Sequence, residues 1–378
     1  MESEFSSAET DGNLWKWGRE RLQSVINTFI EGSKIGSGIN LTGPGLAKNY
    51  KGTNIYIAAS DEKHIEFWDI DKKKLSHRIE NAHPKKITAL AATPGPSLVV
   101  SGSIDCSLAL WNFPEKSLYH RFIDAHSAWI SSIVVTNDGI YFASGSADNS
   151  IAIWDIGSKS CHYRLNDVNQ HPASALSVTL DSALLVSGSS NSIIVWDIYL
   201  KSVHFQLNYA HKDIVSSIAN IPRTNCIVSA SYDKSIAVWD LAQRALLYRF
   251  EDAHSDKITQ VTVGLDARFA VSASEDRSIA VWDLQQKCLY HRFENAHTSV
   301  INSVSVTEDS QFIVSLGNSR TLAVWNIELK SIEMRIDNPH HEKISSVAVT
   351  LDSKYFFTGS WDKTISMWNF EERDLVHR

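Results

Sequence analysis

The chain has 378 residues, a net charge of −7 and a hydrophobic fraction of 43%. This acidic balance provides no global positive field to hold a nucleic-acid backbone, so we expect no nucleic-acid binding. We find no run of about 18 apolar residues, and therefore expect no membrane span, and the acidic, polar start of the sequence is unlike a secretory signal.

The first part of the chain has three sections. Residues 1–12 are short and polar and predict a disordered tail. Residues 13–31 predict an amphipathic helix, because large apolar side chains recur there at helical spacing: Trp15, Leu22, Val25, Ile26 and Phe29. This helix could pack on the rest of the protein, dock to a partner or lie on a membrane surface. Residues 32–53 are rich in Gly, Ser and Asn and predict a linker or a degenerate first strand.

From residue 54 onward the sequence repeats. The stretch Ser144–Asp155 recurs down the chain, and its tryptophan returns at intervals of 42 or 43 residues: Trp68, Trp111, Trp154, Trp196, Trp239, Trp282, Trp325 and Trp368. A second column lies 28 residues before most of these tryptophans: His83, His126, His211, His254, His297 and His340. Periods of this length indicate one supersecondary unit repeated many times.

Each unit predicts four short strands. In one copy these are residues 130–136, 140–146, 150–154 and 160–165, separated by turn-forming residues such as Asn137, Asp138 and Gly139. Four antiparallel strands repeated radially give one blade of a β-propeller. A blade cannot bury both of its faces alone, so stacking against its neighbours must do so.

These motifs resemble the WD-repeat (WD40) family over residues 54–378. The resemblance implies an all-β protein that is a single WD40-type β-propeller, here preceded by the short helix. Eight third strands favour eight blades. The alternative is a seven-bladed ring in which residues 75–80 close the last blade.

The repeated His, Ser and Asp residues suggest a catalytic triad, but we reject that interpretation. The same set occurs several times, whereas an active site occurs once per domain. The resemblance implies instead a buried hydrogen-bond chain in each blade, from His through Ser and Asp to Trp. Its expected members are His83, Asp105, Trp111, His126, Asp148, Trp154, His211, Asp233, Trp239, His254, Asp276, Trp282, His340, Asp362 and Trp368.

Two repeats depart from this pattern. In one, Asn169 stands where His is expected, with His171 nearby, and the turn Ser190–Asn191 is one residue short and lacks the Asp. In the other, Ser319 replaces the Asp. We expect these two blades to be locally weaker or differently wired.

Function is expected where the repeats disagree. Two variable columns fall in loops at one end of the predicted ring, one in the loop before the first strand and one in the turn after the second. We predict a partner-binding surface there, formed by Lys86, Trp129, Ile214, Lys257, Val300, Lys343, Tyr232, Glu275, Asn318 and Trp361.

The sequence therefore predicts a non-enzymatic scaffold or adaptor that binds other proteins or peptides around the central channel, within a multisubunit assembly. An alternative is a regulatory subunit that docks through the helix of residues 13–31, similar to a G-protein β-subunit. A propeller enzyme is a remote alternative, since the sequence shows no catalytic motif outside the repeated positions. We expect no cofactor, metal or small-molecule ligand. The four cysteines, one in each of four repeats, predict reduced thiols in the cytoplasm or nucleus.

Overall fold

The computed structural model describes residues 46–48, 54–59, 63–69, 72–93, 98–165, 175–307, 309–350, 353–360, 362 and 364–378. These residues form strands and turns and contain no helix. None of the described elements is therefore a helix able to cross a membrane. The expected tail at 1–12, the expected helix at 13–31 and most of the segment 32–53 lie outside the described residues.

The described residues form eight four-stranded antiparallel sheets, each built from four strands that follow one another along the chain. The first sheet contains β1 (Leu46–Lys48), β2 (Asn54–Ala59), β3 (Ile65–Asp69) and β4 (Lys74–Ile79), and the second contains β5 (Ile87–Ala92), β6 (Leu98–Ser103), β7 (Leu108–Asn112) and β8 (Ser117–Phe122). The third contains β9 (Ile130–Val135), β10 (Tyr141–Ser146), β11 (Ile151–Asp155) and β12 (Ser160–Leu165), and the fourth contains β13 (Ala175–Val178), β14 (Leu184–Ser189), β15 (Ser192–Asp197) and β16 (Ser202–Leu207). The fifth sheet contains β17 (Val215–Asn220), β18 (Cys226–Ser231), β19 (Ile236–Asp240) and β20 (Ala245–Phe250), and the sixth contains β21 (Ile258–Val263), β22 (Phe269–Ser274), β23 (Ile279–Asp283) and β24 (Cys288–Phe293). The seventh contains β25 (Ile301–Val306), β26 (Phe312–Gly317), β27 (Thr321–Asn326) and β28 (Ser331–Asp337), and the last contains β29 (Ile344–Val349), β30 (Tyr355–Ser360), β31 (Ile365–Asn369) and β32 (Asp374–His377).

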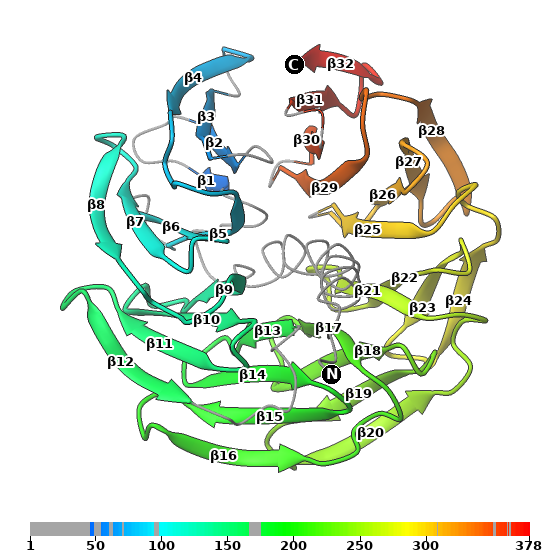
Figure 1. The fold of residues 1–378 in the computed structure, drawn as a ribbon. Helices are drawn as coiled ribbons and strands as arrows, with labels where there is room; N and C mark the ends of the chain where they lie inside the picture. The colour runs from blue at the N-terminus through cyan, green and yellow to red at the C-terminus, as the bar shows by residue number, and fades with distance from the viewer. Residues whose placement is uncertain are drawn as a thin grey trace, which may run out of the picture.

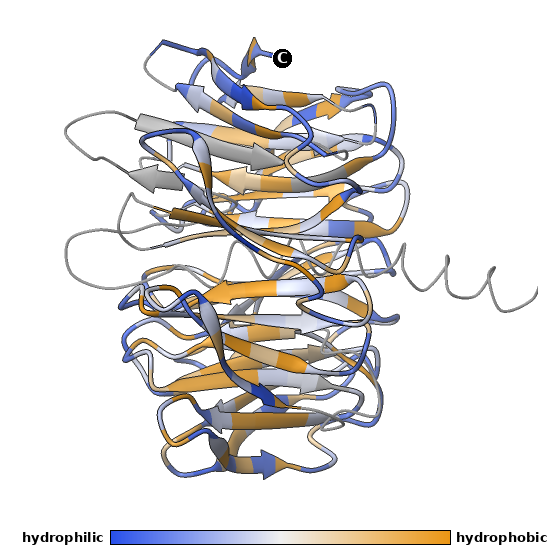
Figure 2. Ribbon diagram, turned by 60° about the vertical axis from the view of Figure 1, so that its left-hand side comes forward, coloured by the Kyte–Doolittle hydropathy of each residue, from blue (hydrophilic) through white to orange (hydrophobic). Residues whose placement is uncertain are grey.

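The sheets are arranged radially around a central axis, with the first strand of each sheet innermost and the fourth outermost (Figure 1). Apolar residues concentrate in the strands, and polar residues concentrate in the loops at both ends of the ring (Figure 2). The core is divided between neighbouring sheets. One cluster, for example, joins Val100 and Leu110 of one sheet to Ile133 and Phe142 of the next.

Burial follows from this stacking. The inner strand β9 is buried at all six positions, as is β25. In a sheet with one face exposed to solvent, buried and exposed residues alternate along each strand. Continuous burial along β9 and β25 therefore means that both faces of these strands are covered. The outer strand β12 has only its last residue fully buried.

A bulge accompanies the repeated tryptophan. In every sheet the register between the third and fourth strands shifts between the tryptophan and the residue before it, as at Ile153 and Trp154. A bulge adds a residue to one strand and redirects the side chain there. Trp154 itself is only 5% exposed.

Side-chain packing joins the first sheet to the last. Trp68 of β3 lies in one cluster with Phe357, Ile365 and Met367 of sheet β29–β32. Its ring centroid is 5.4 Å from that of His377 on β32. In Figure 1, β4 and β32 accordingly face each other across this junction. No strand is shared between these two sheets, since each pairs only its own four strands.

Candidate functional site

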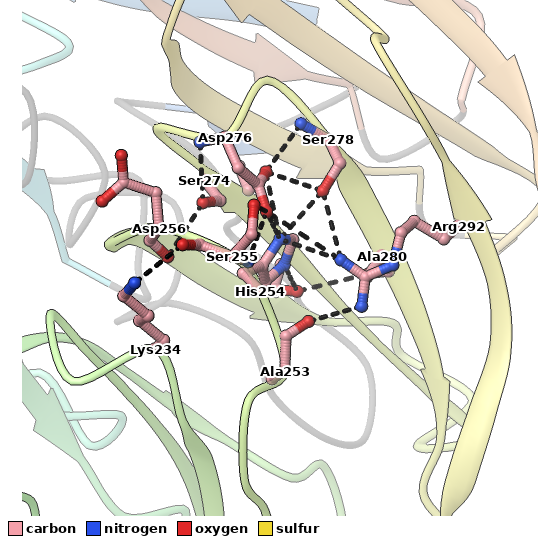
Figure 3. Close-up of polar contacts among 12 residues, drawn as sticks. Lys234, Ala253, His254, Ser255, Asp256, Ser274, Asp276, Ser278, Ala280 and Arg292 are labelled. Carbon is pink, nitrogen blue, oxygen red and sulfur yellow. Dashed lines mark hydrogen bonds and ion pairs between the residues drawn. The ribbon is translucent and has the colours of Figure 1, made fainter.

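The repeated polar residues form a hydrogen-bond chain whose order is Trp, Ser, His, Asp. In sheet β21–β24, the indole Nε1–H of Trp282 donates to Ser272 Oγ at 2.9 Å, and Ser272 Oγ lies 2.7 Å from His254 Nε2. His254 Nδ1 lies 3.1 Å from Asp276 Oδ2 (Figure 3). The expected order, in which Asp connects Ser to Trp, is therefore wrong. The imidazole connects the two ends, because Nε2 faces Ser272 and Nδ1 faces Asp276 and Ser278.

The same geometry occurs in four other sheets. The His Nδ1 to Asp Oδ2 distances are 3.2, 3.0, 3.1 and 3.1 Å for His83–Asp105, His126–Asp148, His211–Asp233 and His340–Asp362. Trp111, Trp154 and Trp239 each donate to a Ser hydroxyl, and Trp368 donates to Thr358.

The electrostatics of these sets suit a scaffold. Burial raises the pKa of the Asp148 carboxyl, but hydrogen bonds from His126 and Ser150 outweigh it and hold that pKa below its ordinary value. Burial lowers the pKa of His126, whose side chain is only 3% exposed. Both imidazole nitrogens are already engaged inside the protein, so a substrate could not reach them. Among the described residues, no group of His, Cys, Asp and Glu could hold a metal ion.

In five sheets an arginine in or directly after the fourth strand completes the network: Arg121, Arg164, Arg249, Arg292 and Arg378. Arg292 donates through Nη2 to the carbonyl oxygen of Ala253 at 2.5 Å and through Nη1 to Ser278 Oγ at 3.3 Å. Arg121 does the same for Ala82 and Ser107. These arginines are visible as a sequence column, but their target is a backbone carbonyl, which leaves no signal in the sequence.

Sheet β25–β28 lacks the Asp carboxylate of the hydrogen-bond chain, and its His297 and Ser319 make different hydrogen bonds. His297 Nδ1 lies 2.5 Å from Thr321 Oγ1, while Ser319, in the Asp position, accepts a hydrogen bond from Thr298 Oγ1 at 2.9 Å. Burial lowers the pKa of His297 to about 4, helped by the positive charge of Arg335. Gly317 stands where sheet β21–β24 has Ser274, and a Cβ at Gly317 would lie 2.6 Å from His297 Nδ1.

The two other irregular repeats also differ. Residues 169 and 171 lie outside the described residues, but Trp196 in that sheet keeps its bond to Ser187 Oγ at 2.8 Å. In the first sheet, Trp68 Nε1 donates to the carboxylate of Glu66 at 3.2 Å. Burial raises the pKa of Glu66, with Arg78 opposing it.

The two variable columns lie at one end of the ring, which we call the upper face. Backbone hydrogen bonds join them in pairs: the amide of the turn residue donates to the carbonyl of the loop residue at 2.8–3.0 Å. The pairs are Ile104–Lys86, Ala147–Trp129, Tyr232–Ile214, Glu275–Lys257 and Asn318–Val300.

Other members of the predicted surface vary in how far the structure describes them. Lys257 Nζ lies 4.9 Å from the ring centroid of Tyr232, which belongs to the neighbouring sheet. The carbonyl of Lys343 accepts from Ser360 Oγ at 3.1 Å. Trp361 lies outside the described residues. The described side chains of the predicted surface are half-buried, except for Asn318, which is exposed.

Tyr209 and Ile123 are exposed apolar residues of the upper face that the sequence analysis missed. Tyr209 is 83% exposed and Ile123 75% exposed. Tyr209 has a left-handed φ of 54°, in a column whose other described members are Asn or Asp: Asn81, Asp124, Asp252, Asn295 and Asn338. Asn and Asp tolerate this backbone conformation better than bulky residues do. An alignment of the repeats could have identified Tyr209 as the exception.

The opposite end of the ring, which we call the lower face, carries a basic column that was also missed. A Lys or Arg with φ of 51–56° ends each turn between the third and fourth strands: Lys73, Lys116, Lys159, Lys201, Arg244, Lys287, Lys330 and Arg373. Several of these cations lie over an aromatic ring of the preceding sheet, such as Lys159 over Tyr119 at 3.9 Å and Lys330 over Tyr290 at 4.3 Å. Such contacts stabilise the packing of adjacent sheets.

Comparison with known protein families agrees with this geometry. The family model described as "WD domain, G-beta repeat" matches seven segments, namely residues 74–112, 117–155, 160–197, 202–240, 245–283, 286–326 and 333–369. Each segment runs from the outer strand of one sheet through the third strand of the next, so β1–β3 and β32 fall outside the seven matches. No curated protein matches the chain.

Proposed function

Because this chain belongs to the WD40-repeat family, we propose that it is a non-enzymatic scaffold that binds partner proteins or peptides on its upper face. Propellers of this family typically serve as platforms for protein interactions. The proposal extends this general role to the residues predicted at the mouth of the central channel, and to a place within a multisubunit assembly.

One observation carries the proposal. The paired columns keep the same backbone hydrogen bond in five sheets, while their side chains change from sheet to sheet. One pair contains Trp129 and another contains Ile214 and Tyr232, whereas a third joins Lys257 to Glu275. A constant backbone with variable side chains is what a recognition surface requires, since rigid loops lose little entropy on binding.

Tyr209 supplies a second argument. An exposed aromatic ring in a left-handed backbone conformation gains little for the fold, whereas Asn or Asp would fit the position better. Residues that break a local structural rule without stabilising the fold are candidates for function. Tyrosine is also enriched among residues that dominate binding at protein interfaces.

Affinity capture from cell extract tests the proposal, with the full chain as bait beside a Trp129→Ala/Tyr232→Ala variant. We expect the variant to lose the proteins captured by the wild type. Its unfolding free energy, measured by denaturant unfolding, should stay within about 1 kcal/mol of the wild-type value. A Leu329→Glu variant on the lower face is the control and should keep them. An unchanged set of captured proteins in the first variant would refute the upper-face site.

Two finer proposals accompany this function. We propose that sheet β1–β4 acts as an eighth blade, since Trp68 packs against both Phe357 and Met367 of the last sheet. We also propose a reducing compartment such as the cytoplasm, because the four cysteines are free and Cys161 and Cys288 are exposed. Imaging of a fluorescent fusion would test the second of these.

A further inference from the structure

The lower face carries an apolar patch that crosses the boundary between two sheets. Ile140 lies in the turn between β9 and β10, and Tyr199 and Leu200 lie in the turn between β15 and β16. Their side chains are 47%, 51% and 74% exposed, respectively. We call these three residues, with Tyr141 and His162 beside them, the Tyr199 patch.

Ring contacts and a hydrogen bond join the two sheets within the Tyr199 patch. The ring centroid of Tyr141 is 6.0 Å from that of Tyr199 and 4.6 Å from that of His162. The Tyr199 hydroxyl donates to Asp138 Oδ2 at 3.0 Å, across the sheet boundary. Asp138 is itself held, since its amide nitrogen donates to Ser182 Oγ at 3.0 Å. These contacts hold the Tyr199 ring in place before any partner arrives, which limits the entropy that this side chain loses on binding.

The fold does not require apolar residues at these positions. The two residues equivalent to Tyr199 and Leu200 are Glu371 and Glu372 in the last sheet, and Gln285 and Gln286 in sheet β21–β24. Positions equivalent to Ile140 hold Asn225, Arg268, Gln311 and Lys354 in other sheets. Since these turns form equally well with polar residues, the exposed apolar side chains call for another explanation. A cluster of exposed apolar side chains on a soluble surface commonly marks an interaction site.

Charge around the patch indicates the chemistry of the partner. Four carboxylates lie in or directly before the lower-face turns of these two sheets: Asp138, Asp155, Asp181 and Asp197. The basic column contributes only Lys159 and Lys201 there, and the ammonium group of Lys159 lies over the ring of Tyr119, 3.9 Å from its centroid. The apolar patch is thus bordered by a local excess of negative charge, which attracts a cationic partner.

We propose that the Tyr199 patch binds a basic amphipathic segment of another protein. The apolar side chains of that segment cover Ile140, Tyr199 and Leu200, and its Lys or Arg residues lie beside the bordering carboxylates. This site lies on the face opposite the partner surface proposed above. One ring can therefore join two partners, and either site can fail its test without affecting the other.

The test uses the full chain and a synthetic 18-residue helical peptide of Leu and Lys, with a peptide of Leu and Glu as the control. Fluorescence anisotropy measures the dissociation constant for wild type, for Tyr199→Glu/Leu200→Glu and for Leu329→Glu/Glu328→Gln. The first variant reproduces the Glu371–Glu372 turn that the fold already accepts, so folding is preserved. The second changes the equivalent turn of sheet β25–β28, where Leu329 is 68% exposed.

We expect the Leu–Lys peptide to bind the Tyr199→Glu/Leu200→Glu variant at least tenfold more weakly than wild type, despite the added negative charge. The Leu329 control should change the dissociation constant less than twofold, and the Leu–Glu peptide should not bind. Asp138→Asn should weaken binding and reduce its dependence on salt.

Three results would overturn the proposal. The first is binding that survives in the Tyr199→Glu/Leu200→Glu variant, which would reflect only the net charge of the protein. The second is a wild-type dimer that this variant converts to a monomer, since the occupant would then be a second copy of the chain. The third is binding to phosphatidylserine vesicles that the variant abolishes, which would make the patch a membrane contact.

Discussion

Replacing Asp148 with Ala should destabilise the protein far more than replacing Ser319 with Ala. The Asp148 carboxylate accepts hydrogen bonds from His126 Nδ1 at 3.0 Å, from the Ser127 amide at 2.9 Å and from the Ser150 hydroxyl at 2.7 Å. Its removal leaves the buried His126 without its acid and the Ser127 amide and Ser150 hydroxyl without their acceptor. Hydrogen bonds to a charged acceptor contribute about 1.5–3 kcal/mol each, so the loss of three of them should cost about 3 kcal/mol or more of unfolding free energy.

Ser319 makes much weaker contacts at the equivalent position. Its hydroxyl accepts one hydrogen bond, from the exposed Thr298 at 2.9 Å, and lies 3.3 Å from Thr321 Oγ1. Loss of one such neutral bond costs about 1 kcal/mol or less. An Asp148→Asn variant serves as a control that keeps an acceptor but removes the charge, and it should fall between the two.

Urea unfolding followed by tryptophan fluorescence measures this difference. With a denaturant slope of about 3 kcal/mol per molar, Asp148→Ala should lower the midpoint by roughly 1 M or more, and Ser319→Ala by no more than about 0.3 M. Equal shifts for the two variants would refute the assignment of the carboxylate to the scaffold.

Three further predictions follow from the irregular sheets. Ser319→Asp should raise the unfolding free energy by about 1 kcal/mol, because it supplies His297 with the missing acid; an unchanged urea midpoint would count against this. Since the folded pKa of His297 is about 4 against an ordinary 6.5, the unfolded chain takes up this proton first as the pH falls. Stability is therefore lost between about pH 6.5 and 4, by up to about 3 kcal/mol, and His297→Gln should remove that part of the pH dependence of urea unfolding. Trp68→Ala should lower the thermal midpoint of the whole ring, because the closing cluster loses its largest side chain; a midpoint equal to that of wild type would mean that sheet β1–β4 is dispensable.

The sequence predicted the repeating unit well because the period is written directly in its tryptophans and histidines. Strand positions within a unit followed from apolar runs and turn residues, and residues 160–165 were predicted as the strand that the structure has as β12. The structure describes eight sheets, but the family model matches seven repeats, which is the alternative count, so the expected count of eight blades stays a proposal. The family matches leave out β1–β3 of the first sheet, where Trp68 donates to Glu66 and not to a Ser.

What the sequence could not predict depends on contacts between sheets or with the backbone. The order of the hydrogen-bond chain depends on which imidazole nitrogen faces Ser144 and which faces Asp148. The Tyr199 patch joins residues that are 61 positions apart, Asp138 and Tyr199, and only the ring geometry brings them together. An alignment of the repeats can show that Tyr209 departs from a column of Asn and Asp, but the φ of 54° that makes this departure costly is not visible in a sequence.

The central claim is that repeated residues hold the scaffold and that residues breaking the repeat bind partners. Tyr209→Asn tests it most directly, when urea unfolding and affinity capture are measured on the same preparation. The account predicts that the unfolding free energy rises by up to about 1 kcal/mol, because Asn suits the left-handed backbone better than Tyr does. It also predicts the loss of upper-face partners, because Asn lacks the aromatic ring. A variant that is stabilised and still captures every partner would contradict the account.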